Sequence, residues 1–440
     1  MRAHLASLLL LASCASYPQR TEAALADFSR GHFDSAMATY GDTSVTDSPF
    51  LSGAEAGMVA LVAGDWATAL EELQKAAAES RDLEERALVS VDKFGDTLAS
   101  WGLNDTQRPY LGEGFERVFL HCGLGLAYLG LGQTEDFGVE VRLANRLLER
   151  EQELYESKYE AGGLGHFLSA LYYELTGDFD DAYIDYKRME EKGIALDLAG
   201  PALVRLAARL GRDDELEEWE ERFGAGTPPD PDSAQVVVVA GVGLGPFKVE
   251  EGMTIPTPNG AFQWRVPAYV SRGQPVARLR LMTGESSQSV DTAILEDVDS
   301  VARANLGDRL GWMAAKSVAR GILKRKLTKE LKEDHGTLGL VVGDIFSFIT
   351  ERADLRAWQT LPGSWQACRA FLPPGTHTLV LDAIGGESQE LGQFELEPGE
   401  TMFVFARTLG ARLWAHPIGG RLIEPAEPTL TPSLSLEEGP

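Results

Sequence analysis

Several residues in this sequence could bind a ligand or support catalysis, and their spacing decides which chemistry is available. Gly241, Gly243 and Gly245 follow a run of four valines, as in a loop that binds a dinucleotide. Such a loop must open a helix whose N-terminus binds the pyrophosphate, whereas here Pro246 and another extended run follow. Lys248 completes no phosphate-binding loop, because no Gly-Lys-Ser/Thr triplet occurs. We therefore expect a glycine loop at a strand end and no bound nucleotide.

The histidines, serines and acidic residues form no catalytic or metal-binding pattern. The sequence has no His-Glu-x-x-His pair and no Gly-x-Ser-x-Gly turn, which are the patterns of zinc peptidases and serine hydrolases. Adjacent carboxylates such as Glu71-Glu72 lie in acidic helical stretches and are expected on solvated helix faces. Cys122 and Cys368 fall in different predicted domains, so we expect two buried thiols rather than a disulfide. We predict no enzyme activity, no cofactor and no metal site.

One cysteine near the N-terminus has a predicted chemical role. Arg2 and the short apolar run Leu5–Leu11 have the order of a secretory signal, and the run is too short to span a bilayer. The residues Leu11-Ala12-Ser13-Cys14 resemble the lipobox of bacterial lipoproteins. The resemblance implies removal of a signal peptide, residues 1–13, and acylation of Cys14 that labels with palmitate and anchors the chain durably. An ordinary secretory signal is the alternative.

The residue after the cysteine bears on localisation. In the lipoprotein sorting rule of Gram-negative bacteria, Asp at that place retains a lipoprotein in the inner membrane. Ala15 stands there instead. The resemblance therefore implies a lipid anchor in the outer membrane of the cell envelope, which we expect on the periplasmic face.

Charge divides the 440-residue chain into two parts. Of the formal net charge of −27, residues 14–232 contribute −24, residues 233–440 contribute −4 and Arg2 contributes +1. The acidic first part should repel nucleic acid and anionic headgroups, so we expect no nucleic-acid partner. A Gly/Pro-rich breaker at 224–232 marks the change. We predict one domain at 14–224, a linker at 225–234 and a second domain at 235–423.

The acidic part contains a repeat. A glycine recurs at Gly31, Gly64, Gly132, Gly177 and Gly211. Apart from one interval that carries an insertion, the spacing is close to one or two periods of the tetratricopeptide repeat (TPR), a helix pair of about 34 residues. Glycine suits the turn between paired helices because it tolerates positive φ, and Trp66 and Phe179 are predicted wedges between neighbouring repeats. We predict a TPR-like α-solenoid; the alternative is a helical domain without regular stacking.

The second part is predicted to be α+β. Period-two patterns and β-branched runs predict strands at Gln235–Ala240, Phe247–Glu251, Met253–Ile255, Val276–Met282, Gln366–Leu372, Thr376–Ala383, Phe394–Glu397 and Thr401–Thr408. Residues 292–334 are predicted to be helical and 424–440 to be a disordered tail. We expect an antiparallel sheet domain with a long helical insertion. Its last strands, with Pro-Gly turns at 374–375 and 398–399, resemble β-sandwich modules of the PEGA type.

The predicted insertion carries a basic face. Its cations are Lys316, Arg320, Lys324, Arg325, Lys326, Lys329 and Lys332. Leucines at every fourth position should turn the opposite face towards the core. We expect the basic face to dock on the acidic first half; a surface for anionic headgroups or an acidic partner is the alternative.

The string from Thr350 to Pro362 is the densest unexplained motif. Asp354 and Arg356 are expected to pair locally and Trp358 to pack in the core, with a partner-binding site as the alternative. Together with the lipobox and the helical repeats, the Ala-Asp-Leu-Arg-x-Trp-x-x-Leu-Pro string resembles a bacterial family of TPR-containing lipoproteins without assigned activity. The resemblance covers roughly residues 20–415. It implies an envelope accessory role, with neither cofactor nor catalytic residues.

These observations favour a protein-binding role. A solenoid of stacked helix pairs presents an extended groove for segments of other proteins. We predict a membrane-anchored scaffold for protein–protein interaction that assembles or regulates a cell-envelope machine, with envelope proteins as partners. A regulator of peptidoglycan synthesis is the first alternative and an envelope enzyme acting on glycan or peptide is the second. An enzyme needs a deep pocket with converging titratable groups, whereas a scaffold needs a broad groove.

Overall fold

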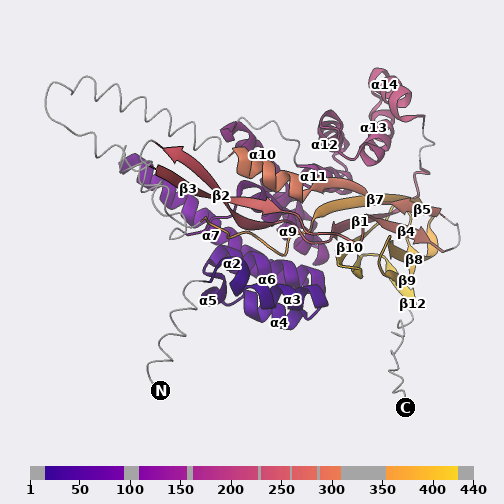
Figure 1. Cartoon of the computed structure of the whole chain (residues 1–440). Helices are drawn as coiled ribbons and strands as arrows, with labels where there is room; N and C mark the ends of the chain where they lie inside the picture. The colour runs from indigo at the N-terminus through magenta and orange to yellow at the C-terminus, as the bar shows by residue number, and fades with distance from the viewer. Residues whose placement is uncertain are drawn as a thin grey trace, which may run out of the picture.

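The computed structural model describes residues 15–93, 109–155, 162–225, 229–257, 260–284, 288–308 and 353–424. The first half is helical, as predicted, and consists of helices that follow one another as helix–turn–helix pairs (Figure 1). The helices are α2 (Tyr17–Arg20), α3 (Glu22–Arg30), α4 (Phe33–Tyr40), α5 (Thr43–Thr46), α6 (Pro49–Ala63), α7 (Trp66–Lys93), α9 (Gly114–Gly130), α10 (Thr134–Tyr155), α11 (Gly163–Thr176), α12 (Phe179–Glu191), α13 (Leu196–Leu210) and α14 (Asp213–Phe223).

Glycines with left-handed backbone end the first helix of each main pair. Gly31, Gly64, Gly177 and Gly211 are the C-caps of α3, α6, α11 and α13, with φ between +67° and +84°. Gly132 has φ +72° and lies just beyond the end of α9. A side chain would strain each of these positions. The five repeat glycines therefore lie in turns between paired helices.

The first helices of the pairs form an inner row. α6, α9 and α11 are buried over almost their whole length, because the second helix of each pair covers one side and the sheet domain covers another. Small residues allow close approach within a pair. A β-carbon at Gly57 would lie 2.6 Å from the Leu73 side chain, and one at Gly125 would lie 3.2 Å from that of Phe137.

The second half contains two five-stranded sheets and a separate two-stranded ribbon. The strands are β1 (Ala234–Val242), β2 (Phe247–Thr257), β3 (Gly260–Val270), β4 (Leu279–Thr283), β5 (Gln288–Asp291), β6 (Ala293–Asp297), β7 (Ser364–Leu372), β8 (Gly375–Ala383), β9 (Ser388–Leu396), β10 (Thr401–Leu409), β11 (Arg412–Ile418) and β12 (Arg421–Glu424). One sheet has the order β11-β10-β1-β7-β6 and the other β12-β9-β8-β4-β5. The ribbon is β2-β3.

The sheet domain is mixed rather than wholly antiparallel. β1 and β10 are parallel neighbours, whereas β1 and β7 are antiparallel. A parallel pair needs a long connection, and here almost the whole second half of the chain separates the two strands. No local pattern in the sequence reports such a pairing. The expected antiparallel arrangement therefore holds for the other strand pairs of the two sheets and fails at the pair β1 and β10.

The sheet that contains β1 is buried on both faces. Val236 and Val238 belong to the core shared with the second sheet, whereas Val237 and Val239 belong to the core shared with the helices. The molecule therefore has three layers, with helices, the β1 sheet and the β4 sheet in that order. Consecutive valines suit a strand with two apolar faces, which explains the four-valine run.

The boundaries of the second half differ from the predicted ones in places. Residues 293–297 form strand β6, and the helix begins only at residue 298. Sequence patterns also missed β3, β5, β11 and β12. The remainder of the predicted helical insertion, and the predicted tail from residue 425, lie outside the described residues. Within the described part of the chain, no helix is long and apolar enough to cross a membrane.

Candidate functional site: the buried polar interface between the halves

The Ala353–Pro362 segment lies between the helical half and the sheet, where two carboxylates from the helices bind its backbone. Trp358 N donates to Oε1 of Glu116 at 2.7 Å. Gln359 N and Thr360 N donate to the two oxygens of Glu55 at 2.7 and 2.9 Å. Three consecutive amides thus donate to two buried carboxyl groups, and such hydrogen bonds are among the stronger ones in proteins when the carboxyl group is ionised.

Glu55 is fully buried in α6 and is the only charged residue of that helix. Tyr17 donates its hydroxyl to Oε1 of Glu55 at 2.7 Å. Burial raises the pKa of Glu55, and the hydrogen bonds from residues 359, 360 and 17 oppose that rise. A single acid in an otherwise uncharged apolar helix was a signal in the sequence that the predictions did not use.

Glu116 is the second buried carboxyl group. It accepts from Tyr110 Oη at 2.7 Å and from Glu113 N at 2.9 Å, besides Trp358 N. Burial raises the pKa of Glu116 to about 7, against the opposing effect of the Lys248 ammonium. Lys248 itself is buried and pairs with the Glu113 carboxylate.

The residues singled out in the Ala-Asp-Leu-Arg string are bound within the chain. Arg356 Nη2 lies 2.7 Å from Oδ2 of Asp354, and its guanidinium stacks over the ring of Tyr110 at 5.1 Å. The Trp358 side chain is 2% exposed, and its Nε1 donates to Thr360 Oγ1 at 2.9 Å. The string is therefore a structural link between the halves, with little surface left for a partner.

Arg407 approaches the same segment from β10. Its side chain is fully buried and donates from Nη2 to the carbonyl oxygen of Thr360 at 2.8 Å. Its guanidinium lies over the ring of Phe28 at 5.9 Å. Burial lowers the pKa of Arg407 to about 9. A cation placed in an apolar interior is costly unless it is compensated, so this contact fixes the segment at the expense of stability.

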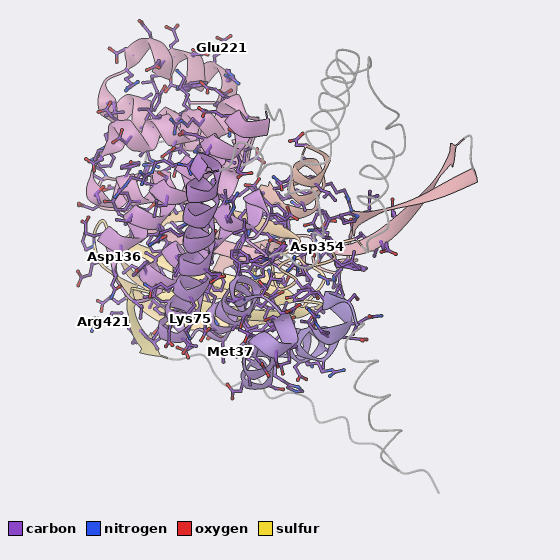
Figure 2. All side chains as sticks on the ribbon, turned by 90° about the vertical axis from the view of Figure 1, so that its left-hand side faces the viewer. Met37, Lys75, Asp136, Glu221, Asp354 and Arg421 are labelled. Atoms are coloured by element: carbon purple, nitrogen blue, oxygen red, sulfur yellow. The ribbon has the colours of Figure 1, made fainter. Side chains whose placement is uncertain are left out.

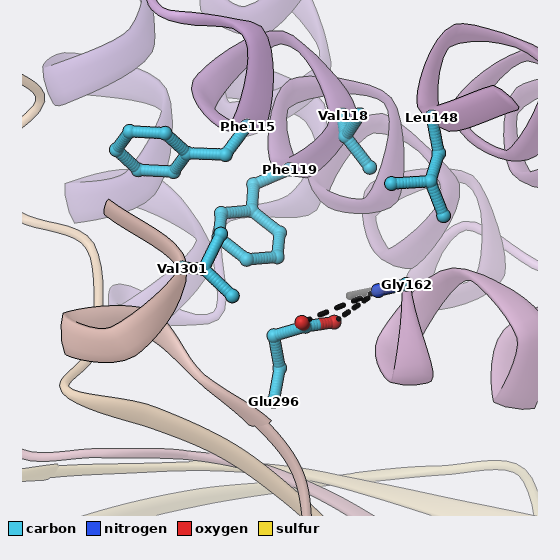
Figure 3. A pocket seen from close by; sticks show the side chains of 7 residues that line it. All are labelled: Phe115, Val118, Phe119, Leu148, Gly162, Glu296 and Val301. Carbon is cyan, nitrogen blue, oxygen red and sulfur yellow. Dashed lines mark hydrogen bonds between the residues drawn. The ribbon is translucent and has the colours of Figure 1, made fainter. Parts of the chain in front are cut away.

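A third buried glutamate belongs to the sheet domain and binds the backbone of the helical half. Glu296 of β6 accepts from Gly162 N at 2.9 Å (Figure 3). It also accepts from Leu164 N at 3.4 Å, at the N-terminus of α11. Burial raises the pKa of Glu296 to about 7, although these backbone hydrogen bonds oppose the rise. A small cavity of about 10 Å³ adjoins it, lined by Phe115, Val118, Phe119, Leu148 and Val301. That space suffices for about one water molecule.

Glu174 of α11 is paired rather than isolated. Arg369 of β7 and Arg205 of α13 place Nη1 atoms 3.0 and 2.9 Å from its oxygens. Tyr186 also donates to it at 2.8 Å. Burial alone would raise the pKa of Glu174, but the two guanidinium groups lower it to about 2.

Strand β11 packs on the repeat turns. A β-carbon at Gly31 would lie 2.8 Å from the Trp414 ring, and one at Gly64 would lie 2.7 Å from that of His416. His416 also bonds the carbonyl oxygen of Val62 at 2.9 Å, near the end of α6. These glycines therefore serve the contact between the halves as well as the turn.

The two predicted wedges are half-buried rather than enclosed between helices. Trp66 lies edge-on to Phe405, with ring centroids 5.8 Å apart, and covers Gly130 of α9. Phe179 lies under the guanidinium of Arg209 at 3.9 Å. Trp66 therefore packs against both the next helix pair and the sheet, whereas the contact of Phe179 with Arg209 is to the next helix pair.

The glycine loop after β1 has no dinucleotide geometry. Gly243 has φ +64°, and its N donates to Thr408 Oγ1 at 2.9 Å. Gly245 N donates to the carbonyl oxygen of Leu361 at 2.7 Å, and the chain continues into β2 rather than into a helix. The loop therefore binds its own chain.

The remaining predicted site residues are the lipidated cysteine, the basic face and the two other cysteines. Cys14 and the basic face of residues 316–332 lie outside the described residues. Among the residues that are described, no group of three or more His, Cys, Asp or Glu could hold a metal ion. Cys122 and Cys368 are buried free thiols.

Comparisons with known proteins leave the fold and the site as the basis for function. No family model, no curated protein and no solved structure matches the chain.

Proposed function

We propose that the protein is a lipid-anchored envelope protein that acts by binding other proteins, through a TPR-like solenoid folded around its own β-sandwich. The turn glycines and the small-to-large contacts at Gly57 and Gly125 support TPR-like stacking. The single observation that carries the proposal is the filled inner row: α6, α9 and α11 contact the chain's own sheet and the 353–362 segment. A partner then meets the outer row of helices.

Two exposed apolar residues stand at equivalent places on the outer row. Val139 of α10 and Ile184 of α12 stand at the same distance in sequence from their turn glycines, and each is 44% exposed. Exposed apolar side chains at equivalent places of successive repeats are a candidate contact for a partner. We place the anchor at Cys14 in the outer membrane, so this partner is an envelope protein.

Site-specific photo-crosslinking in intact cells tests the proposal. A photoreactive residue at Val139 or at Ile184 should crosslink to the same envelope protein, whereas one at Thr376, exposed on the far sheet, should not. Equal crosslinking from all three positions, or none from the helices, would reject the outer row as the binding surface. A penicillin-binding protein in the crosslink would favour the role in peptidoglycan synthesis.

The anchor is tested separately. Cells supplied with labelled palmitate should label the wild-type chain and leave the Cys14→Ser variant unlabelled. Equal labelling of both chains would reject the lipid anchor without touching the proposed binding surface.

A further inference from the structure

The first described residues are fixed to the body of the protein by hydrogen bonds. Ser16 N donates to Gln19 Oε1 at 2.8 Å, and the carbonyl oxygen of Ser16 accepts from Gln19 N and Arg20 N at 3.0 Å. Tyr17 is 3% exposed, and its hydroxyl donates to the buried Glu55 of α6 at 2.7 Å. α2 is therefore held against the helical core from its first turn.

The same contacts join this end of the chain to the junction between the halves. Glu55 also accepts from Gln359 N and Thr360 N, so one carboxyl group binds both α2 and the segment that links the halves. α2 packs on α5 as well, where Nη2 of Arg20 lies 3.8 Å from Oδ2 of Asp47. The start of the described chain should therefore move with the whole body.

The proposed lipid site is directly next to this fixed segment. Cys14 is bonded to Ala15, the first described residue, and consecutive Cα atoms are only about 3.8 Å apart. Ala15 and Ser16 are partly exposed, so the surface around them is accessible. A folded body that is tied so closely to a bilayer, and stays outside it, must touch the bilayer at the point of attachment.

This geometry identifies the surface that faces the lipid. We propose that residues 15–22 and 42–48, which form α2, α5 and their flanks, lie against the lipid bilayer; we call this surface the anchor face. The inference rests on the lipid anchor of the proposed function. It adds a fixed orientation of the body, which an anchor on a long flexible linker would not give.

The helix pairs stack in chain order away from the anchor face. α4 packs on α6, α7 on α9, α10 on α11 and α12 on α13, so α14 lies at the other end of the row. Figure 2 shows Met37 of α4 and Glu221 of α14 at opposite ends of the molecule, and Figure 1 shows α5 and α14 equally far apart in the view. Since packed helices lie about 8–10 Å apart, the five described pairs extend over roughly 40 Å.

The distribution of charge favours the same orientation. α14 carries seven acidic residues and one arginine, which anionic headgroups would repel. The anchor face carries three acidic residues, Glu22, Asp42 and Asp47, together with Arg20. It is not basic, so the covalent lipid rather than electrostatic attraction must hold it at the bilayer. The Cys14→Ser variant should therefore not sediment with vesicles, and its sedimentation would reject the lipid as the cause of the orientation.

The orientation also restricts the partner. Val139 of α10 and Ile184 of α12 lie in the third and fourth of the described helix pairs. At about 10 Å for each pair, they stand roughly 20–30 Å beyond the first pair. A partner that contacts both residues should therefore carry a folded domain that stands well clear of the headgroups.

Two dye positions test the orientation. Thr43→Cys on α5 and Glu221→Cys on α14 are both exposed. The buried Cys122 and Cys368 are expected to remain unlabelled, and lipid occupies Cys14. The acylated chain is placed in phosphatidylcholine vesicles that contain a lipid with a nitroxide on its headgroup, which quenches the dye only at close range. Quenching at position 43 should exceed that at position 221 by about fivefold or more, because roughly 40 Å separates the ends of the row. Equal quenching, or more at position 221, would overturn the proposal.

A longer attachment is the matched control. About 20 Gly and Ser residues inserted between Ala15 and Ser16 keep the acylation site and the folded contacts, and extend over about 25 Å. The two dyes should then be quenched to within about twofold of each other, because the body can turn freely. A preference that survives the insertion would show that the short attachment does not orient the body. Palmitate labelling is measured on the same chains: an unlabelled chain rejects the anchor itself, whereas a labelled chain with equal quenching rejects only the orientation.

Discussion

Glu296 and Glu174 place the same side-chain type in two electrostatic settings at the junction of the halves. Glu296 accepts from backbone amides across the interface, and burial raises its pKa to about 7. Glu174 meets two guanidinium groups, which lower its pKa to about 2 against the effect of burial. Opposite shifts make opposite contributions to the pH dependence of stability.

The first residue-scale prediction is that Glu296→Gln flattens the neutral-pH dependence of stability. Between about pH 4.5 and 7 the folded state keeps a proton that the unfolded state releases. The free energy of unfolding therefore falls as pH rises through this window, by up to about 3 kcal/mol for this group. Urea unfolding at pH 5 and pH 8 should show a smaller fall in the variant. Glu22→Gln, at an exposed position, is the control and should keep the wild-type fall. An unchanged fall in Glu296→Gln would contradict the assignment.

The second residue-scale prediction concerns acid. Glu174 is ionised in the folded state down to about pH 2, so its contribution is present above about pH 4.5 and is lost as pH falls towards 2. Glu174→Gln should reduce the loss of stability in that window. At pH 7 it should also destabilise by roughly 3–5 kcal/mol, because Arg369 remains buried without its anion. Thermal unfolding from pH 2.5 to 7 measures both effects, and a variant as stable as wild type at pH 7 would refute them.

At the scale of elements, the repeat register was predictable and the contacts of the turns were not. A glycine at the end of a helical pattern predicts a left-handed cap, and Gly64 and Gly177 have that conformation. Gly64 lies in the first half of the sequence and His416 near its end, so no local pattern connects the turn with β11. The same limit hid the partners of Glu55 and Glu116, because the amides that they bind belong to the other half of the chain.

Comparison of two turn glycines separates the cost of backbone strain in the turn from the cost of overlap with β11. Gly132→Ala introduces only backbone strain, since a β-carbon there would have nothing within 4 Å. Gly64 has a similar φ, and in Gly64→Ala the new β-carbon would also overlap the His416 ring. We expect roughly 1 kcal/mol of destabilisation for Gly132→Ala and about 2–4 kcal/mol for Gly64→Ala, because overpacking costs about 1–3 kcal/mol more. Equal losses in denaturant unfolding would show that the contact with β11 does not constrain the turn.

At the scale of the molecule, the division into an acidic helical part and a nearly neutral sheet part was visible in the composition. α14 ends at Phe223, just before the predicted linker 225–234, and β1 begins at Ala234, the last residue of that linker. Composition could not show that the two parts share a core, because residues from α6, α9, β1 and β10 meet in one cluster only after folding. Docking through the predicted basic face was the electrostatic expectation. That face lies outside the described residues. The part of the interface that the structure describes is an apolar face with buried ion pairs and carboxylate–amide contacts.

A shared core of this size implies that the halves unfold together. Equilibrium urea unfolding of the full chain, followed in the same samples by far-ultraviolet circular dichroism and by tryptophan fluorescence, tests this most directly. The dichroism reports mainly the helices, and the fluorescence includes Trp365 and Trp414 of the sheet. We expect coincident transitions with one midpoint, and Glu55→Ala should shift both curves together. Helices that melt at a clearly different urea concentration from the sheet would contradict a single body with the sheet docked in the inner row.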